Sequence, residues 1–169
     1  EIGICLAKAI QKLHQMQPPL LYLDCKPSNV MKDSDGKIRL IDFGSALEAH
    51  TPVTKGISAS PGYAAPEQLS REIEKRCVDV RTDVFGLGRT LYALLCGADL
   101  SRPPYAFASL KSRCPQVSDE LERIIMRATA REPEARFQTM EAFLQVLLAL
   151  QEACRVDDTG KKEPFWQKV

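Results

Sequence analysis

The sequence contains no run of apolar residues long enough to cross a lipid bilayer, and no segment with the features of a signal peptide. It also lacks an excess of either charge, because the formal net charge is +1 over 169 residues. Electrostatic attraction therefore gives no reason to expect nucleic acid or an anionic membrane as a partner. Histidine is scarce: His14 and His50 are isolated in the sequence, and we expect no catalytic role for either.

The cysteines show no C-x-x-C spacing, which is typical of zinc sites and thiol redox motifs. They are scattered over the chain as Cys5, Cys25, Cys77, Cys96, Cys114 and Cys154. We therefore expect reduced thiols in a cytoplasmic protein rather than zinc ligands or disulfides. The first residue is Glu1 instead of Met, so we expect the sequence to be a piece of a longer protein.

The residues that are present predict a mainly α domain with a small β-hairpin. Hydrophobic residues make up 44% of the chain and charged residues 27%, which is typical of one globular domain with its own core. Apolar residues recur at helical spacing in four segments, residues 2–14, 79–96, 118–128 and 140–150. Residues 30–32 and 37–41 are predicted to be strands, joined by a polar turn at 33–36.

One stretch between the first two predicted helices combines the residue types that phosphoryl transfer requires. Asp24, Lys26 and Asn29 have the spacing D-x-K-x-x-N, and the tripeptide Asp42-Phe43-Gly44 follows the predicted hairpin. The reaction needs a carboxylate to orient or accept the hydroxyl proton, a cation for the phosphate charge, and oxygen ligands for Mg²⁺. Asp24 suits the first role and Lys26 the second. Asn29 and Asp42 suit the third.

Together with Ala65-Pro66-Glu67, this arrangement resembles the catalytic loop and the metal-binding turn of a protein kinase. The alternative, an ordinary hairpin turn at 33–36 followed by a strand-end carboxylate, does not account for all three motifs in one chain. The resemblance implies ATP and Mg²⁺ as cofactors. It also implies a protein substrate with Ser or Thr hydroxyls, and no nucleic acid partner.

The resemblance assigns roles to the segment that leads from the tripeptide to Glu67. Residues 45–60 are polar and resemble an activation segment, which Phe43 and Gly44 open. In kinases, the hydroxyl at the position of Ser60 bonds towards the catalytic Asp and Lys and shapes the substrate groove. Lys26 together with Ser60 is the combination found in Ser/Thr kinases, as opposed to tyrosine kinases.

Three residues have structural roles in the resemblance. Asp83, near the start of the second predicted helix, is expected to bond backbone amides of the catalytic loop. Arg136 and Glu67 are expected to form a partly buried ion pair. Without the resemblance, Asp83 would be an acid favoured by the helix dipole and Arg136 an exposed cation.

The resemblance covers about residues 2–152 and corresponds to the C-terminal lobe of a Ser/Thr kinase, with the bacterial type fitting best. We therefore expect a kinase C-lobe at residues 1–153 and a tail or linker at 154–169. The glycine-rich loop, strand lysine and partner Glu of an N-terminal lobe do not occur in the sequence. We expect catalysis in a full-length parent that supplies this lobe, and no activity from the piece alone.

Leu23 is the main departure from the family pattern. The His-Arg-Asp triplet of kinases is Tyr22-Leu23-Asp24 here, so the arginine that normally receives an activation-loop phosphate is replaced. We therefore expect activity that is insensitive to phosphorylation of Thr51, Thr54 or Ser58.

Two functional interpretations follow. The first is the C-lobe of an active Ser/Thr kinase, and the second is a pseudokinase-like lobe that is retained for protein contacts. The four intact motif residues favour the first. In either case, loss of an N-terminal lobe would leave apolar side chains without cover near Leu21, Met31, Ile41 and Phe43. We expect self-association of such a surface, or a Phe43 that folds back over the lobe.

Overall fold

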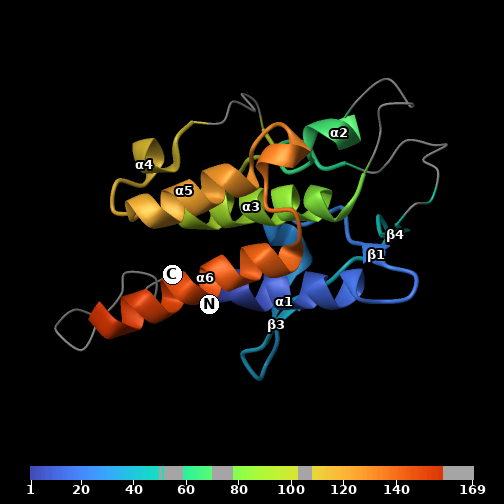
Figure 1. Cartoon of the computed structure of the whole chain (residues 1–169), viewed down its shortest axis with the longest axis horizontal. Coiled ribbons are helices and arrows are strands. Elements are labelled where there is room, and N and C mark those ends of the chain that lie inside the picture. The colour runs from blue at the N-terminus through green and yellow to red at the C-terminus, as the bar shows by residue number, and fades with distance from the viewer. Residues whose placement is uncertain (50, 52–58, 70–77, 103–107, 158–169) are drawn as a thin grey trace.

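The computed structural model describes residues 1–49, 51, 59–69, 78–102 and 108–157. Its long helices form two layers (Figure 1). Helices α1 (Ile2–His14) and α6 (Met140–Asp157) pack side by side in one layer. Helices α3 (Val80–Cys96) and α5 (Asp119–Ala128) pack in the other. The predicted mainly α architecture is therefore confirmed for the described residues.

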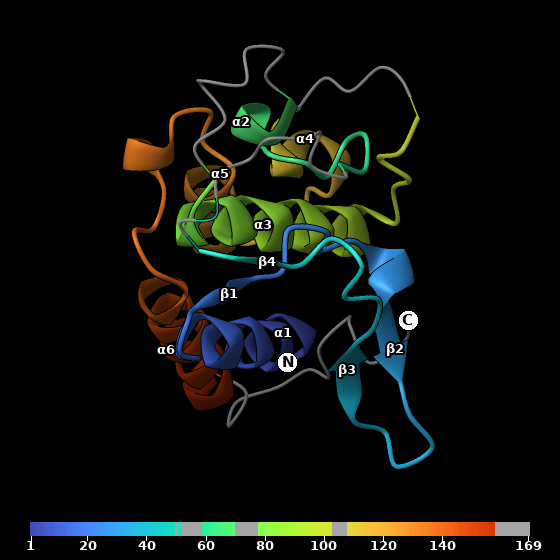
Figure 2. The same cartoon turned by 90° about the vertical axis from the view of Figure 1, so that its right-hand side faces the viewer.

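Short elements connect these helices: β1 (Leu20–Leu21), η1 (Pro27–Asn29), β2 (Val30–Lys32), β3 (Ile38–Leu40), β4 (Leu47–Glu48), α2 (Pro66–Leu69), α4 (Leu110–Arg113) and η3 (Pro133–Ala135). The predicted hairpin is formed by β2 and β3, with Val30 opposite Leu40. Strands β1 and β4 form a second antiparallel pair, with Leu20 opposite Glu48 (Figure 2). This pair is not predictable from the sequence, because two-residue strands carry no alternating pattern.

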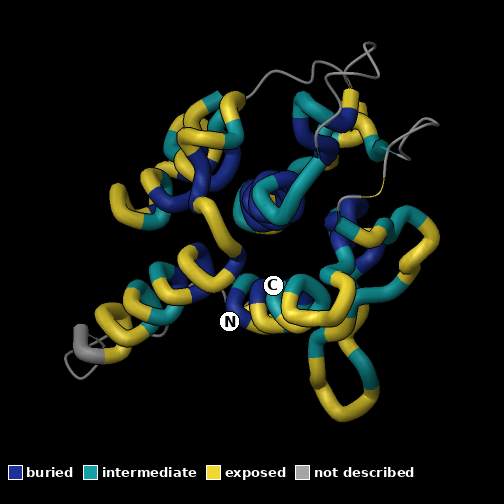
Figure 3. The backbone as a smooth tube through the Cα atoms, turned by 45° about the vertical axis from the view of Figure 1, so that its right-hand side comes forward, coloured by how far each residue is buried: buried dark blue, intermediate teal, exposed yellow. Residues whose placement is uncertain are grey.

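Helix α3 forms the centre of the molecule (Figure 3). Its sequence defines both ends: Asp79 accepts a hydrogen bond from the Arg81 backbone and forms a capping box with Thr82, while Gly97 ends the helix with a φ of 60°. A helix with apolar residues on most of its faces has to be covered on most of its faces. Residues 82–93 are accordingly all buried. The segment that carries Asp83 is therefore enclosed by the rest of the chain.

The hydrophobic core fills the space between the two layers. Leu6 and Ile10 of α1, Leu87 of α3, Ile125 of α5 and Phe143 of α6 are all at most 1% exposed. Each such side chain contributes about 1.5–3 kcal/mol by leaving water. The core thus packs the two helical layers, including α1 and α3, against each other.

Two expectations need correction. Leu21 does not lack cover, because it is fully buried in the β1–β4 pair. His14 is isolated in the sequence but has a partner in the structure, because its Nε2 lies 2.8 Å from a carboxylate oxygen of Asp83. In both cases the partner is remote in sequence. Helix α6 continues to Asp157, so the boundary expected at residue 154 lies inside it.

Several sequence-based expectations concern residues outside the described ranges, namely His50, Thr54, Ser58, Cys77 and residues 158–169. All described cysteines are free thiols. None of the described helices has the length and apolarity required to span a membrane.

Candidate active site

The predicted catalytic residues meet in a closed ring of hydrogen bonds. Lys26 Nζ donates to Asp24 Oδ2 and to Ser60 Oγ, at 2.7 Å in each case. Ser60 Oγ in turn donates to Asp24 Oδ1 at 2.7 Å. Ser60 is 36 residues from Asp24, so the ring joins the activation segment to the catalytic loop. Each member holds the other two in one orientation.

Asn29 supports the same carboxylate from the other end of the loop. Its Nδ2 donates to the backbone oxygen of Asp24 at 2.9 Å and to the side-chain Oδ2 at 3.1 Å. The 3₁₀ turn η1, opened by Pro27, makes this contact possible by bringing Asn29 back towards Asp24. The amide nitrogen is therefore engaged, and the side-chain oxygen Oδ1 is the group that Asn29 can offer to a cation.

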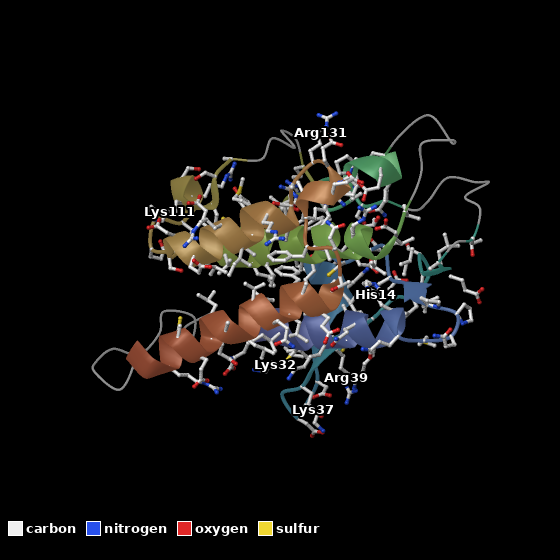
Figure 4. The ribbon with its side chains drawn as sticks, viewed as in Figure 1. His14, Lys32, Lys37, Arg39, Lys111 and Arg131 are labelled. Atoms are coloured by element: carbon white, nitrogen blue, oxygen red, sulfur yellow. The ribbon has the colours of Figure 1, made fainter. Side chains whose placement is uncertain are left out.

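Asp83 holds the backbone that precedes Asp24. Its carboxylate accepts hydrogen bonds from the backbone N–H groups of Tyr22 at 2.8 Å and Leu23 at 2.7 Å. His14, from the last turn of α1, contacts the same carboxylate (labelled in Figure 4). The Asp83 side chain is fully buried. The expected contact between Asp83 and the catalytic loop is present, and it fixes the loop to the central helix.

Further bonds hold the catalytic loop from two sides. Thr90 of α3 donates its hydroxyl to the backbone oxygen of Cys25 at 2.9 Å. Gln68 of α2 donates from Nε2 to the backbone oxygen of Leu23 at 2.9 Å. Leu23 has a φ of 65°, a left-handed conformation that residues with a Cβ rarely adopt without support. Side chains from two helices therefore supply that support.

A side chain of α3 holds the turn that carries Ser60. Arg89 donates from Nε to the backbone oxygen of Gly62 at 2.6 Å. Gly62 has a φ of 80°, and a Cβ at this position would overlap the backbone oxygen of Leu100. Glycine is therefore required here by both conformation and space. The backbone N–H groups of Tyr63 and Ala64 donate to the backbone oxygen of Ser60, which closes the turn.

Asp42 lies on an exposed turn, whereas the ring of Asp24, Lys26 and Ser60 is partly buried. The Ile41 N–H donates to the backbone oxygen of Asn29, which brings the two predicted metal ligands to the same end of the β2–β3 hairpin. Asp42 has a φ of 61°, and its Oδ1 accepts from the Gly44 N–H at 3.0 Å. Phe43 contacts the ring of Tyr22 edge to face, with 5.3 Å between centroids, but remains 48% exposed.

The residues at this turn fit a magnesium ion that is shared with a nucleotide. The described residues contain no group of three or more His, Cys, Asp or Glu side chains that could hold a metal by themselves. Asp42 and Asn29 supply one carboxylate and one amide oxygen. Mg²⁺ prefers such oxygen ligands and commonly takes the rest of its coordination from phosphates and water.

Burial changes the pKa values of two side chains near Asp24 in the sequence, Cys25 and Tyr22. It raises the pKa of the Cys25 thiol to about 12, with a smaller opposing contribution from the Thr90 hydroxyl. Burial also raises the pKa of the Tyr22 phenol, and the negative charges of Cys25 and Asp24 add to the shift. Neither the Cys25 thiol nor the Tyr22 phenol therefore ionises near neutral pH.

Glu67 and Arg136 form a bidentate ion pair beneath the activation segment, as expected. The two N···O distances are 2.7 and 2.9 Å, and the Arg136 side chain is fully buried. Arg136 also donates to three backbone oxygens, those of Arg81, Ala130 and Arg131. All three guanidinium nitrogens of Arg136 therefore donate hydrogen bonds, and together these bonds join α2, α3 and the turn that follows α5.

Four supporting residues were not predicted from the sequence: His14, Gln68, Arg89 and Thr90. Arg89 and Thr90 could have been found, since a cation and a hydroxyl stand within a helix that is apolar on most faces and so have to be buried. Nothing in the sequence distinguishes Gln68, because its partners are backbone atoms 3 and 45 residues away.

Comparison with known proteins identifies the family. The protein kinase domain family matches residues 1–161. The chain belongs to the protein kinase family. The Ser/Thr kinase Pkn1 of Myxococcus xanthus is 35% identical over 160 residues, which cover 81% of this chain and 22% of that protein. Rhodopsin kinase GRK1 of Rattus norvegicus is 34% identical over 146 residues, or 85% of this chain and 23% of that protein.

Solved kinase structures share the fold. The kinase domain of Mycobacterium tuberculosis PknI superposes with a TM-score of 0.67 and 28% identity, over 88% of this chain and 52% of that domain. The chain thus spans about half of a solved kinase domain and less than a quarter of the length of the two curated relatives.

Proposed function

We propose that this chain is the catalytic-loop half of a Ser/Thr protein kinase of bacterial type, which transfers the γ-phosphoryl group of ATP to protein Ser or Thr hydroxyls. The observation that carries the proposal is the ring of Asp24, Lys26 and Ser60, with all three distances at 2.7 Å. A carboxylate, an ammonium group and a hydroxyl from the substrate-side loop are thereby assembled at one point. This is the set of groups that an in-line phosphoryl transfer needs on its acceptor side.

In the proposed reaction, Asp24 orients the substrate hydroxyl and accepts its proton. The hydroxyl oxygen attacks the γ-phosphorus while the bond to the β-phosphate oxygen breaks, and ADP leaves. Lys26 lies 2.7 Å from Asp24, so its ammonium group is placed to balance the charge of the phosphoryl group as it approaches. Positioning by the preformed ring, rather than covalent chemistry, supplies the protein's contribution.

Bound Mg-ATP supplies the transferred group and neutralises its charge. Asp42 and the Oδ1 of Asn29 are the proposed metal ligands, because both offer oxygen and the backbone bond from Ile41 to Asn29 brings the two residues to the same end of the β2–β3 hairpin. Met31, on the hairpin strand that follows Asn29, is 48% exposed and adds apolar surface to the hairpin. In this proposal, the protein hydroxyl that accepts the phosphoryl group binds on the buried side of the site, and the ATP that donates it binds on the exposed side.

We further propose that the remaining half of a kinase domain, from the same parent chain, covers this exposed side. The chain spans 52% of the PknI kinase domain, so about half of such a domain lies outside the sequence. A groove of about 340 Å³ runs between α1 and β3, lined by Leu13, Leu40 and Phe43 and by the cations Lys12 and Arg39. Without that cover, we expect the chain to self-associate through this groove and Met31. A cytoplasmic location is proposed on the reduced cysteines.

The test is a phosphoryl-transfer assay on the complete kinase with labelled ATP and matched peptides whose acceptor is Ser, Thr or Tyr. Transfer to Ser and Thr, with little to Tyr, is the expected result. A complete kinase that binds protein partners but transfers no phosphate to any acceptor, including itself, would favour the pseudokinase-like interpretation instead.

A further inference from the structure

Gln68 connects the two segments that build the acceptor side of the site. Its side chain lies in the short helix α2 and is 4% exposed. The side-chain oxygen accepts the Ala65 N–H at 2.9 Å, and the side-chain nitrogen donates to the backbone oxygen of Leu23 at 2.9 Å. A single amide group therefore bonds the Ala-Pro-Glu segment and the catalytic loop at the same time.

The oxygen that Gln68 holds belongs to the peptide between Leu23 and Asp24. Leu23 is in the left-handed region, with a φ of 65°, where a residue with a Cβ persists only if its surroundings hold it. Asp83 fixes the N–H of this residue at 2.7 Å, and Gln68 fixes its carbonyl. The plane of the Leu23–Asp24 peptide sets the direction in which the Asp24 side chain leaves the backbone.

We infer that Gln68 is a positioning residue for Asp24. It holds the carbonyl of the strained Leu23 and so keeps the Asp24 carboxylate aimed at the substrate hydroxyl. This inference rests on the proposed kinase function of Asp24. Because Gln68 also bonds Ala65, it ties the aim of Asp24 to the docking of the segment that carries Ser60.

An amide is the side-chain group that suits this position. The Leu23 carbonyl needs a donor and the Ala65 N–H needs an acceptor, and a Gln side chain supplies one of each. An ionised carboxylate supplies acceptors only, and it would face the Leu23 carbonyl oxygen without a proton between them. A protonated carboxyl supplies one O–H donor and one acceptor again. The two forms of a carboxyl at position 68 should therefore behave differently.

The decisive variant is Gln68→Glu in the complete kinase, assayed with Ser peptide and ATP between pH 5.5 and 8. At the upper end we expect kcat to fall about tenfold to a hundredfold, because small misplacements of a reacting group have effects of this size. The KM for ATP should stay unchanged, since Gln68 contacts no group on the nucleotide side. The ratio of variant to wild-type kcat should rise as the pH falls, because the introduced carboxyl takes up a proton and regains its donor.

Two further variants separate positioning from loss of stability. Gln68→Leu removes both hydrogen bonds at similar volume, so its kcat deficit should persist at every pH. Thr129→Val removes a buried hydroxyl bond to the Ile125 oxygen at 2.8 Å, at the end of α5. This second variant should lower the melting temperature without changing kcat, because it leaves the catalytic loop untouched.

The inference is wrong if Gln68→Glu retains kcat within about twofold of the wild type at pH 8, a change too small for a misplaced catalytic group. It is equally wrong if Gln68→Leu shows the same recovery at low pH. An inactive wild-type kinase would contradict the proposed function instead.

Hydrogen exchange on the 169-residue chain tests the geometry by itself. Gln68→Glu should speed exchange of the Leu23 amide about tenfold or more, while buried α1 amides stay unchanged. Unchanged Leu23 exchange would overturn the inference.

Discussion

The catalytic loop at residues 22–29 and the Asp42-Phe43-Gly44 turn are neighbours with opposite surroundings. Asp24 is 7% exposed and bonds Lys26, Asn29 and Ser60. Asp42 is exposed, and the hydrogen bond recorded for its side chain is to Gly44, two residues away. The acceptor half of the site is therefore organised by the chain itself, whereas the nucleotide half is held mainly by local contacts.

The difference follows from where α3 lies. This helix passes beneath the catalytic loop and reaches it with Asp83 and Thr90, so the loop has partners 60 or more residues away. The hairpin that leads to Asp42 lies instead at the edge of the molecule, where Lys37 and Arg39 project away from the helical layers (Figure 4). The nucleotide half of the site is proposed to be covered by another part of the protein. This chain therefore needs no long-range hydrogen bonds to hold it.

The largest effect is expected when Asp24, in the buried half of the site, is replaced. Asp24→Asn in the complete kinase should lower phosphoryl transfer by about 10²–10⁴-fold, because an amide cannot accept the hydroxyl proton. The fold should remain, since the two side chains are nearly isosteric. Autophosphorylation with labelled ATP measures the change, and Asp33→Asn on the exposed hairpin turn is the matched control. Near-wild-type activity of the Asp24 variant would falsify the assignment.

The next effect concerns the ion pair that supports the buried half. Arg136→Ala leaves Glu67 buried without its partner, which costs about 3–5 kcal/mol. For a chain of this length, the melting temperature should drop by roughly 6–20 °C. Calorimetry on the chain measures it.

The matched control is Arg102→Ala, whose ion pair with Asp99 is exposed, with the Arg102 side chain at 84%. It should shift the melting temperature by no more than about two degrees. Equal shifts in melting temperature for the two variants would mean that burial of the Arg136–Glu67 pair does not contribute to stability.

A smaller effect is expected at the exposed half. The chain alone should bind Mg-ATP no tighter than about millimolar, because two oxygen ligands without a grip on the phosphates hold Mg²⁺ poorly. Asp42→Ala should weaken this binding further and leave the melting temperature nearly unchanged. Titration calorimetry together with sedimentation tests the point. A strict monomer that binds Mg-ATP at micromolar strength would show that the exposed half is organised after all.

The smallest effect is expected for the activation segment. Leu23 cannot pair with a phosphate, so replacing Thr51, Thr54 and Ser58 together with Ala should change the activity of the dephosphorylated complete kinase by well under tenfold. The peptide kinase assay is the measurement. A drop of tenfold or more would point to another cation, such as Arg39, as the partner of a phosphate on this segment.

The sequence alone determined the motifs and the helices. D-x-K-x-x-N spacing and the Asp42-Phe43-Gly44 tripeptide located the site, and helical periodicity located α1, α3, α5 and α6, because both signals lie in short ranges of sequence. Asp83 and the Arg136–Glu67 pair followed from the family resemblance. Their contacts are present in the structure.

Only the tertiary structure decided which residues hold the loop in place. The support of Leu23 by Gln68, the contact of His14 with Asp83, the pairing of Leu21 with Leu47 and the bond from Arg89 to Gly62 all join residues 26 or more positions apart. Most of these partners are backbone groups, which every residue carries, so no sequence pattern marks them. Side-chain identity fixes what each residue can bond, but the packing of α2 and α3 against the catalytic loop fixes which partner it meets.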